Sequence, residues 1–128
     1  MAKKFPVVQD DAYDEMAATY QLLEIARLDE ILKRSRIPSK TRRTICEAYF
    51  FAAGAFLDSG WLTAEGERVF PTLCFADRPV DPDEGLGEIT RLHIPSAGFA
   101  FHEYAGGAFF AYFDDRAGSV DDLEHGCL

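Results

Sequence analysis

Apolar residues recur with helical spacing through residues 12–35, the first strongly patterned stretch of the chain. Asp14 and Glu15 fall in its first turn, where carboxylates suit the positive end of a helix dipole. Pro38 cannot continue a helix, because it lacks a backbone N–H and its ring collides with the preceding turn. The pattern therefore predicts a helix over about 12–35, with an apolar face broad enough to be covered on more than one side.

A second helical stretch covers residues 40–59 and is apolar on nearly every side past Cys46. Ser39 suits the N-cap of this helix, and Gly60 suits the position after its last turn. Gly54 stands between alanines, so another backbone could approach the helix closely there. Since only a few residues separate the two helices, we predict an antiparallel helical hairpin in which the second helix is the central element.

The spacing of apolar residues changes after Trp61. Residues 68–76 alternate like a strand, and Pro71 within them predicts an edge position. Asp81 begins an Asp-Pro-Asp-Glu run typical of a helix start, although nearby glycines weaken the helical pattern that follows it up to His93. We therefore expect a strand and then a short helix in this part of the chain.

Two further strands are predicted at residues 99–104 and 108–114, on either side of Gly106 and Gly107. A pair of glycines tolerates the positive φ angles of a tight hairpin turn. The expected fold class is therefore α+β, with the N-terminal helical hairpin packed on a small C-terminal antiparallel sheet. An all-α fold is the alternative, because the periodicity leaves open whether residues 82–113 are strand or helix throughout.

The length of 128 residues is that of one domain, so a single domain over 1–128 is expected, with loose termini at 1–9 and 117–128. The longest candidate for a membrane segment, 48–57, has ten residues, whereas a membrane-spanning helix needs about 20. We therefore expect a soluble protein that has no membrane partner.

The formal net charge of −9 argues against a nucleic-acid partner, because each phosphate contact needs a Lys or Arg. Cys46, Cys74 and Cys127 are far apart, which favours neither a disulfide framework nor a zinc ribbon, so reduced thiols in the cytoplasm are the simplest interpretation. The sequence contains no metal-ligand pair, phosphate-binding glycine loop or nucleophile elbow. No metal and no cofactor is expected. The missing motifs favour a protein that is not an enzyme, without excluding catalysis.

A strongly basic segment interrupts this acidic chain, since residues 27–43 hold seven Lys or Arg residues and only two acidic ones. Arg42 and Arg43 would lie in the first turn of the second helix, where the helix dipole disfavours positive charge. Backbone N–H groups, hydroxyls and cations would meet there, as a phosphate, a sulfate or an acidic peptide requires. We name this candidate anion site the basic tip, and its residues are Ser39, Lys40, Thr41, Arg42 and Arg43. The alternative is a solvated tip that pairs with acidic groups of this protein, such as Glu47, or of a neighbouring protomer.

His102 and Glu103 form a second candidate site. In the predicted hairpin they point to opposite faces of the sheet, and both faces are apolar, so both side chains are expected to be buried. A carboxyl group in an apolar pocket can serve in acid–base catalysis. The alternative is a hydrogen-bonded core histidine beside a Glu103 that pairs with a helix arginine such as Arg27.

Two classes of function follow from these candidates. The first is a non-catalytic binding or regulatory protein that uses the basic tip for a small anion or an acidic protein partner, with a homo-oligomer as a further option. The second is a small-molecule-binding protein or enzyme with a pocket around Glu103, His102 and Tyr104. A concave cavity that reaches Glu103 would favour the second class, and a solid core with an exposed basic tip would favour the first.

Overall fold

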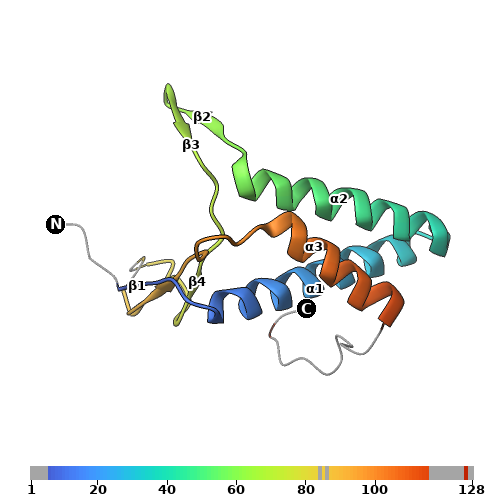
Figure 1. Cartoon of the computed structure of the whole chain (residues 1–128), viewed down its shortest axis with the longest axis horizontal. Helices are drawn as coiled ribbons and strands as arrows, with labels where there is room; N and C mark the ends of the chain where they lie inside the picture. Colours follow the sequence, from blue (N-terminus) through green and yellow to red (C-terminus); the bar gives the residue numbers. More distant parts are fainter. Residues whose placement is uncertain (1–5, 84, 86, 116–125, 127–128) are drawn as a thin grey trace. The chain divides into compact units, whose positions relative to one another are not determined.

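A computed structural model describes residues 6–83, 85, 87–115 and 126, and its fold class is α+β, as predicted (Figure 1). The elements in chain order are β1 (Val7–Val8), α1 (Ala12–Arg34), α2 (Ser39–Ser59), β2 (Leu62–Ala64), β3 (Glu67–Val69), β4 (Phe75–Ala76), β5 (Leu92–His93), α3 (Phe101–Phe110) and the π-helical turn η1 (Ala111–Asp115). They belong to two compact units. Of the described residues, one unit contains those up to Met16 and those of 72–99, and the other contains Ala17–Pro71 and those from Ala100 onward.

The first unit contains a small mixed sheet with the strand order β1-β5-β4, in which β5 pairs in parallel with β1 and in antiparallel with β4. Tyr13 is fully buried in this unit. Its ring contacts Phe75 at a centroid distance of 5.4 Å, and its hydroxyl donates to the backbone oxygen of Leu73 at 2.5 Å. Both termini, 1–9 and 117–128, were expected to be loose. In the N-terminal one, residues 7 and 8 form the strand β1, and residues 1–5 lie outside the described residues. In the C-terminal one, Gly126 alone is among the described residues.

The Asp-Pro-Asp-Glu run does not begin a helix, so that prediction was wrong. Asp81 and Gly85 form an isolated antiparallel bridge, and Asp81 Oδ1 accepts a hydrogen bond from the N–H of Asp83 at 2.7 Å. An aspartate that bonds to the backbone two residues later closes a turn as readily as it caps a helix. Gly85, with a φ of 66°, supplies the left-handed residue that the turn requires.

The predicted edge strand over 68–76 is divided into two separate strands. β3 pairs with β2 in an antiparallel hairpin, and the turn between them uses positive φ angles of 51° at Glu65 and 80° at Gly66. Pro71 lies in the connection between β3 and β4. Since proline cannot donate to a strand ladder, the chain leaves the hairpin before it reaches this residue.

The second unit contains the predicted helical hairpin, in which residues 17–34 of α1 run antiparallel to α2 (Figure 1). Its buried core joins α1, α2 and α3 through Ile25, Cys46, Phe50, Ala105 and Ala108. Gly54 is buried, and a Cβ atom added to it would lie 2.9 Å from the Cα of His102 in α3. The close backbone approach predicted at Gly54 is therefore confirmed.

The caps of α2 differ from the prediction at both ends. Pro38 occupies the N-cap position without a side-chain hydrogen bond, and its carbonyl accepts the N–H of Arg42 at 2.9 Å, so Ser39 is already helical. Gly60 follows the last turn, but its conformation is extended rather than left-handed. Its N–H donates to the carbonyl of Phe56 at 2.7 Å, which satisfies that carbonyl without a left-handed residue.

Helix α3 and the turn η1 cover residues 101–115, where strands were predicted at 99–104 and 108–114, so the hairpin prediction was wrong. The buried residues of α3 are Phe101, Ala105 and Ala108, spaced by four and three as on one face of a helix. The alternation of aromatic and small residues that suggested strands is overridden by packing against α2, because strand propensity depends strongly on tertiary context. Residues 101–115 are therefore helical, as the all-α alternative expected for them, but the strands between residues 62 and 93 make the fold α+β.

Gly106→Ala and Gly107→Ala are each expected to stabilise the protein by about 0.5–1 kcal/mol. Both glycines lie inside α3, and a Cβ atom at either position would meet no atom within 4 Å. Alanine loses less backbone entropy than glycine on folding, so the gain needs no new contact. Urea unfolding followed by far-UV circular dichroism measures the change. A loss of stability in both variants would contradict the helical conformation of this segment.

Candidate functional site

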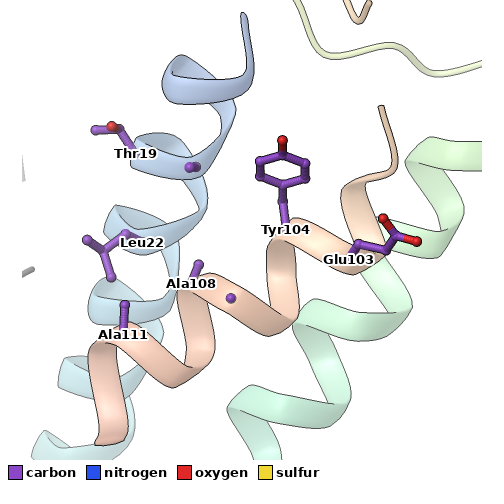
Figure 2. A pocket seen from close by; sticks show the side chains of 8 residues that line it. Thr19, Leu22, Glu103, Tyr104, Ala108 and Ala111 are labelled. Carbon is purple, nitrogen blue, oxygen red and sulfur yellow. The ribbon is translucent and has the colours of Figure 1, made fainter. Parts of the chain in front are cut away.

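A groove of about 440 Å³ lies between α1 and α3 (Figure 2). Its walls come from opposite ends of the chain. The buried residues Leu22 and Ala108 contribute its least hydrated surface. The described residues that line it are Ala18, Thr19, Leu22, Glu103, Tyr104, Gly107, Ala108 and Ala111.

The groove exists because α3 presents small side chains to α1. Gly107, Ala108 and Ala111 share one face of the helix, and Figure 2 shows Ala108 and Ala111 beside Leu22 of α1. None of the three small residues has a side chain larger than a methyl group. They therefore leave between the helices a space that larger side chains would fill in an ordinary core.

The polar groups of the groove are the hydroxyls of Thr19 and Tyr104 and the carboxylate of Glu103. Glu103 is exposed, so the prediction that it is buried in a sheet was wrong. Arg27, the arginine considered as a partner of Glu103, instead forms an ion pair with Glu24, in which Nη1 of Arg27 lies 3.2 Å from Oε1 of Glu24. Glu103 is therefore a solvent-accessible carboxylate at the edge of an apolar groove, available to a cation or a hydrogen-bond donor on a ligand.

His102 does not line the groove, although it precedes Glu103 in the sequence. Its Nδ1 lies 2.5 Å from Asp58 Oδ2, and the same carboxylate accepts the backbone N–H groups of Phe101 at 2.5 Å and of His102 at 3.0 Å. Burial opposes the charged form of Asp58, but these hydrogen bonds outweigh it and lower the pKa of the carboxyl group. Asp58 of α2 thus caps the first turn of α3, and the pair with His102 holds the two helices together.

Both arginines of the basic tip are engaged within the protein. The Nε of Arg42 donates to Asp29 Oδ1 at 2.8 Å, and an Nη of Arg42 donates to the backbone oxygen of Ile37 at 2.9 Å. Arg43 forms a bidentate ion pair with the carboxylate of Asp114, and its guanidinium carbon lies 5.2 Å from the centre of the Phe109 ring. The charge of each arginine is compensated by a carboxylate from another element.

Arg42 and Arg43 are therefore not free cations at the start of α2. Pairing with acidic groups of the same chain is observed, but the ion-pair partner of Arg43 is Asp114 rather than Glu47. Ser39, Lys40, Thr41 and Arg43 are exposed, and Arg42 is the one half-buried residue of the basic tip. Asp29 was not identified from the sequence as the partner of Arg42, nor Asp58 as the partner of His102. Asp58 did carry a signal, because a carboxylate in the last turn of a helix opposes the helix dipole and so needs a compensating group from elsewhere.

Metal and membrane sites were not expected. Among the described residues, no three His, Cys, Asp or Glu side chains gather closely enough to hold a metal ion. In the same part of the chain, no helix has the length and apolar character needed to cross a membrane. Cys46 and Cys74 are free thiols, and Cys127 lies outside the described residues.

Comparison of the chain with protein-family models, with curated proteins and with solved structures finds no match. The functional argument therefore rests on the geometry and chemistry of the groove.

Proposed function

We propose that this protein is a small non-catalytic binding protein of the cytoplasm, and that its ligand site is the groove between α1 and α3. The observation that carries the proposal is a space of about 440 Å³ that reaches Glu103 and is bounded by small apolar side chains. Concave sites of this size, apolar with a few polar groups, are the usual form of small-molecule sites. The free thiols Cys46 and Cys74 agree with a reducing compartment.

The lining indicates the class of ligand. Leu22, Ala108 and Ala111 offer an apolar surface that suits an aromatic or aliphatic ring. Among the described residues that line the groove, Glu103 alone is charged, and the net charge of −9 disfavours anionic ligands. We therefore expect a small apolar amine, with its ammonium group near Glu103 and its ring between the two helices.

The basic tip has less support as the ligand site. Arg42 and Arg43 would have to leave the carboxylates of Asp29 and Asp114 before they could bind an external anion. For Arg42 this exchange is costly, because its partner Asp29 is buried. Of the basic-tip cations, Lys40 alone has no ion pair with another described residue, which is a weak basis for specific anion binding.

Tryptamine is expected to bind more tightly than indole-3-acetate, which carries a carboxylate on the same ring system. Glu103→Gln is expected to weaken tryptamine binding about 2- to 5-fold, since an exposed ion pair contributes up to about 1 kcal/mol. Glu47→Gln is the matched control, because it removes the same charge from an exposed position outside the groove. Isothermal titration calorimetry at low salt measures all four affinities. Tighter binding of indole-3-acetate would contradict the proposed class of ligand.

Gly107→Leu tests the groove itself. A side chain at Gly107 enters open space in the groove, as no atom lies within 4 Å of its Cβ position. Gly106→Leu is the matched control, because Gly106 is equally open and lies in the same helix but does not line the groove. We expect Gly107→Leu to abolish tryptamine binding and Gly106→Leu to preserve it. Equal affinity of the two variants would refute the assignment of the site.

A further inference from the structure

The outer face of α2 is apolar and exposed, although its sequence predicted a helix covered by the rest of the fold. We call this face the α2 stripe, and its residues, at helical spacing, are Ile45, Ala48, Tyr49, Ala52 and Phe56. All five are exposed, with 59% of Tyr49 and 44% of Phe56 accessible to solvent. Thr41 and Ser59 extend the stripe at its two ends, so no charged residue interrupts it along the helix. A contiguous apolar surface of this kind marks an interaction site.

We propose that the α2 stripe binds the α2 stripe of a second copy of this chain, with the two α2 helices antiparallel about a twofold axis. The axis would pass between residues 50 and 51, near the middle of Ser39–Ser59. Tyr49 then lies opposite Ala52 of the partner subunit, and Ile45 lies opposite Phe56 of the partner subunit. Each tyrosine ring meets a small residue, so the face is complementary to itself in this orientation.

The charges at the two ends of α2 favour the same orientation. The exposed cations Lys33, Arg36 and Lys40 lie around the N-terminal end of α2. Glu65 and Glu67 are exposed on the β2–β3 hairpin, which follows the C-terminal end of α2. Antiparallel pairing brings the cations of one copy toward the glutamates of the other, whereas parallel pairing would bring like charges together. Antiparallel helices also place opposite dipole ends side by side.

The pairing leaves the ligand groove free. The groove is lined by residues of α1 and α3, and none of them belongs to the α2 stripe. Loss of dimerisation and loss of ligand binding can therefore be measured separately, and either proposal can fail without the other.

Sedimentation equilibrium of the full chain over a range of concentrations tests the proposal. We expect wild type to be a dimer at about 100 µM, and Tyr49→Glu to raise the dissociation constant at least about 100-fold. Because Tyr49 is exposed within one copy, the far-UV circular dichroism of Tyr49→Glu should match that of wild type. Val80→Glu, a matched change of an exposed apolar residue in the first unit, should leave the dimer intact. A wild type that stays monomeric overturns the proposal, whether another partner or another part of the chain covers the stripe.

Disulfide trapping tests the orientation of the two helices. Thr41→Cys and Ser59→Cys are made separately in a background in which Cys74 and Cys127 are replaced by Ser. The antiparallel arrangement brings residue 41 of one copy near residue 59 of the other. We therefore expect a crosslinked dimer when the two variants are mixed and oxidised, and little crosslinking of either variant alone. Crosslinking of each variant with itself and not with the other would indicate parallel helices and would overturn the proposal.

Discussion

Asp29→Ala is expected to lower the free energy of unfolding by about 3 kcal/mol, because it leaves the Arg42 guanidinium without its counter-ion in a poorly hydrated site. Asp29 is buried, and the side chains of Arg42 and Asp29 are only 18% and 11% exposed. The carboxylate of Asp29 accepts one hydrogen bond from Arg42 at 2.8 Å and another from the hydroxyl of Tyr112 at 2.8 Å. Burial raises the pKa of Tyr112, and the bond to Asp29 raises it further, so the tyrosine stays a donor at neutral pH. One substitution therefore breaks contacts that join α1, α2 and η1.

Two control variants separate this network from ordinary surface pairing. Tyr112→Phe removes one hydrogen bond to a charged acceptor and is expected to cost about 1.5 kcal/mol. Glu30→Ala breaks the ion pair with Arg34, in which both side chains are more than half exposed, and is expected to change stability by less than about 0.5 kcal/mol. Urea unfolding at neutral pH measures all three variants. If Asp29→Ala were no more destabilising than Glu30→Ala, the buried ion pair would not contribute as described.

Gly54→Ala is expected to destabilise the protein by about 2 kcal/mol or more, although alanine is the better helix former. A Cβ atom at Gly54 would lie 2.9 Å from both the Cα and the backbone nitrogen of His102, and 3.0 Å from the carbonyl carbon of Phe101. These atoms belong to the backbone, so no side-chain rotation relieves the contact. Retreat of α3 would stretch the hydrogen bonds that Asp58 accepts from Phe101 and His102.

Gly107→Ala is the internal comparison for this prediction. Both substitutions add one methyl group to a glycine inside a helix, but only Gly54 faces another backbone at close range. Opposite signs of the stability change, measured by thermal and urea unfolding, would support the close packing of α2 on α3. Equal stabilisation by the two alanines would contradict it.

The two N-terminal helices could be predicted from the sequence because their signals are local. First-turn carboxylates, a run of helix formers and a terminating proline act within a few residues of the positions they determine. The observed helices, Ala12–Arg34 and Ser39–Ser59, accordingly match the predictions of 12–35 and 40–59. The caps were less predictable, since a shift of one residue at Pro38 changes which side chain stands at the N-cap.

Helix α3 could not be assigned in the same way. Its aromatic and small residues fit a strand period and a helix period over so short a segment. The N-terminus of the helix is capped by Asp58, a residue of α2 that is distant in the sequence. The local sequence therefore contains no N-capping residue from which the helix start could be predicted. Burial of Ala105 and Ala108 in the core that α3 shares with α2 then selects the helical period over the strand period.

The candidate site could be predicted only in part. Glu103 and Tyr104 were identified from the sequence, and both line the groove. His102 was grouped with them, but successive residues on a helix point about 100° apart, and His102 bonds to Asp58 instead. Thr19 and Leu22 were not identified, because their place beside α3 depends on how α1 and α3 pack.

Arg42 and Arg43 near the start of α2 and Asp58 in its last turn oppose the helix dipole, and each is engaged by a group on another element. The sequence by itself determined where these charges stand, and therefore that each needed a compensating group. Only the tertiary structure decided which groups those are, namely Asp29, Asp114 and the first turn of α3. The dipole acts within one turn and can be inferred from neighbouring residues. The partners of these charges lie on segments that are far apart in the chain and that meet because their apolar surfaces are buried together. Such contacts cannot be predicted from the residues next to each charge.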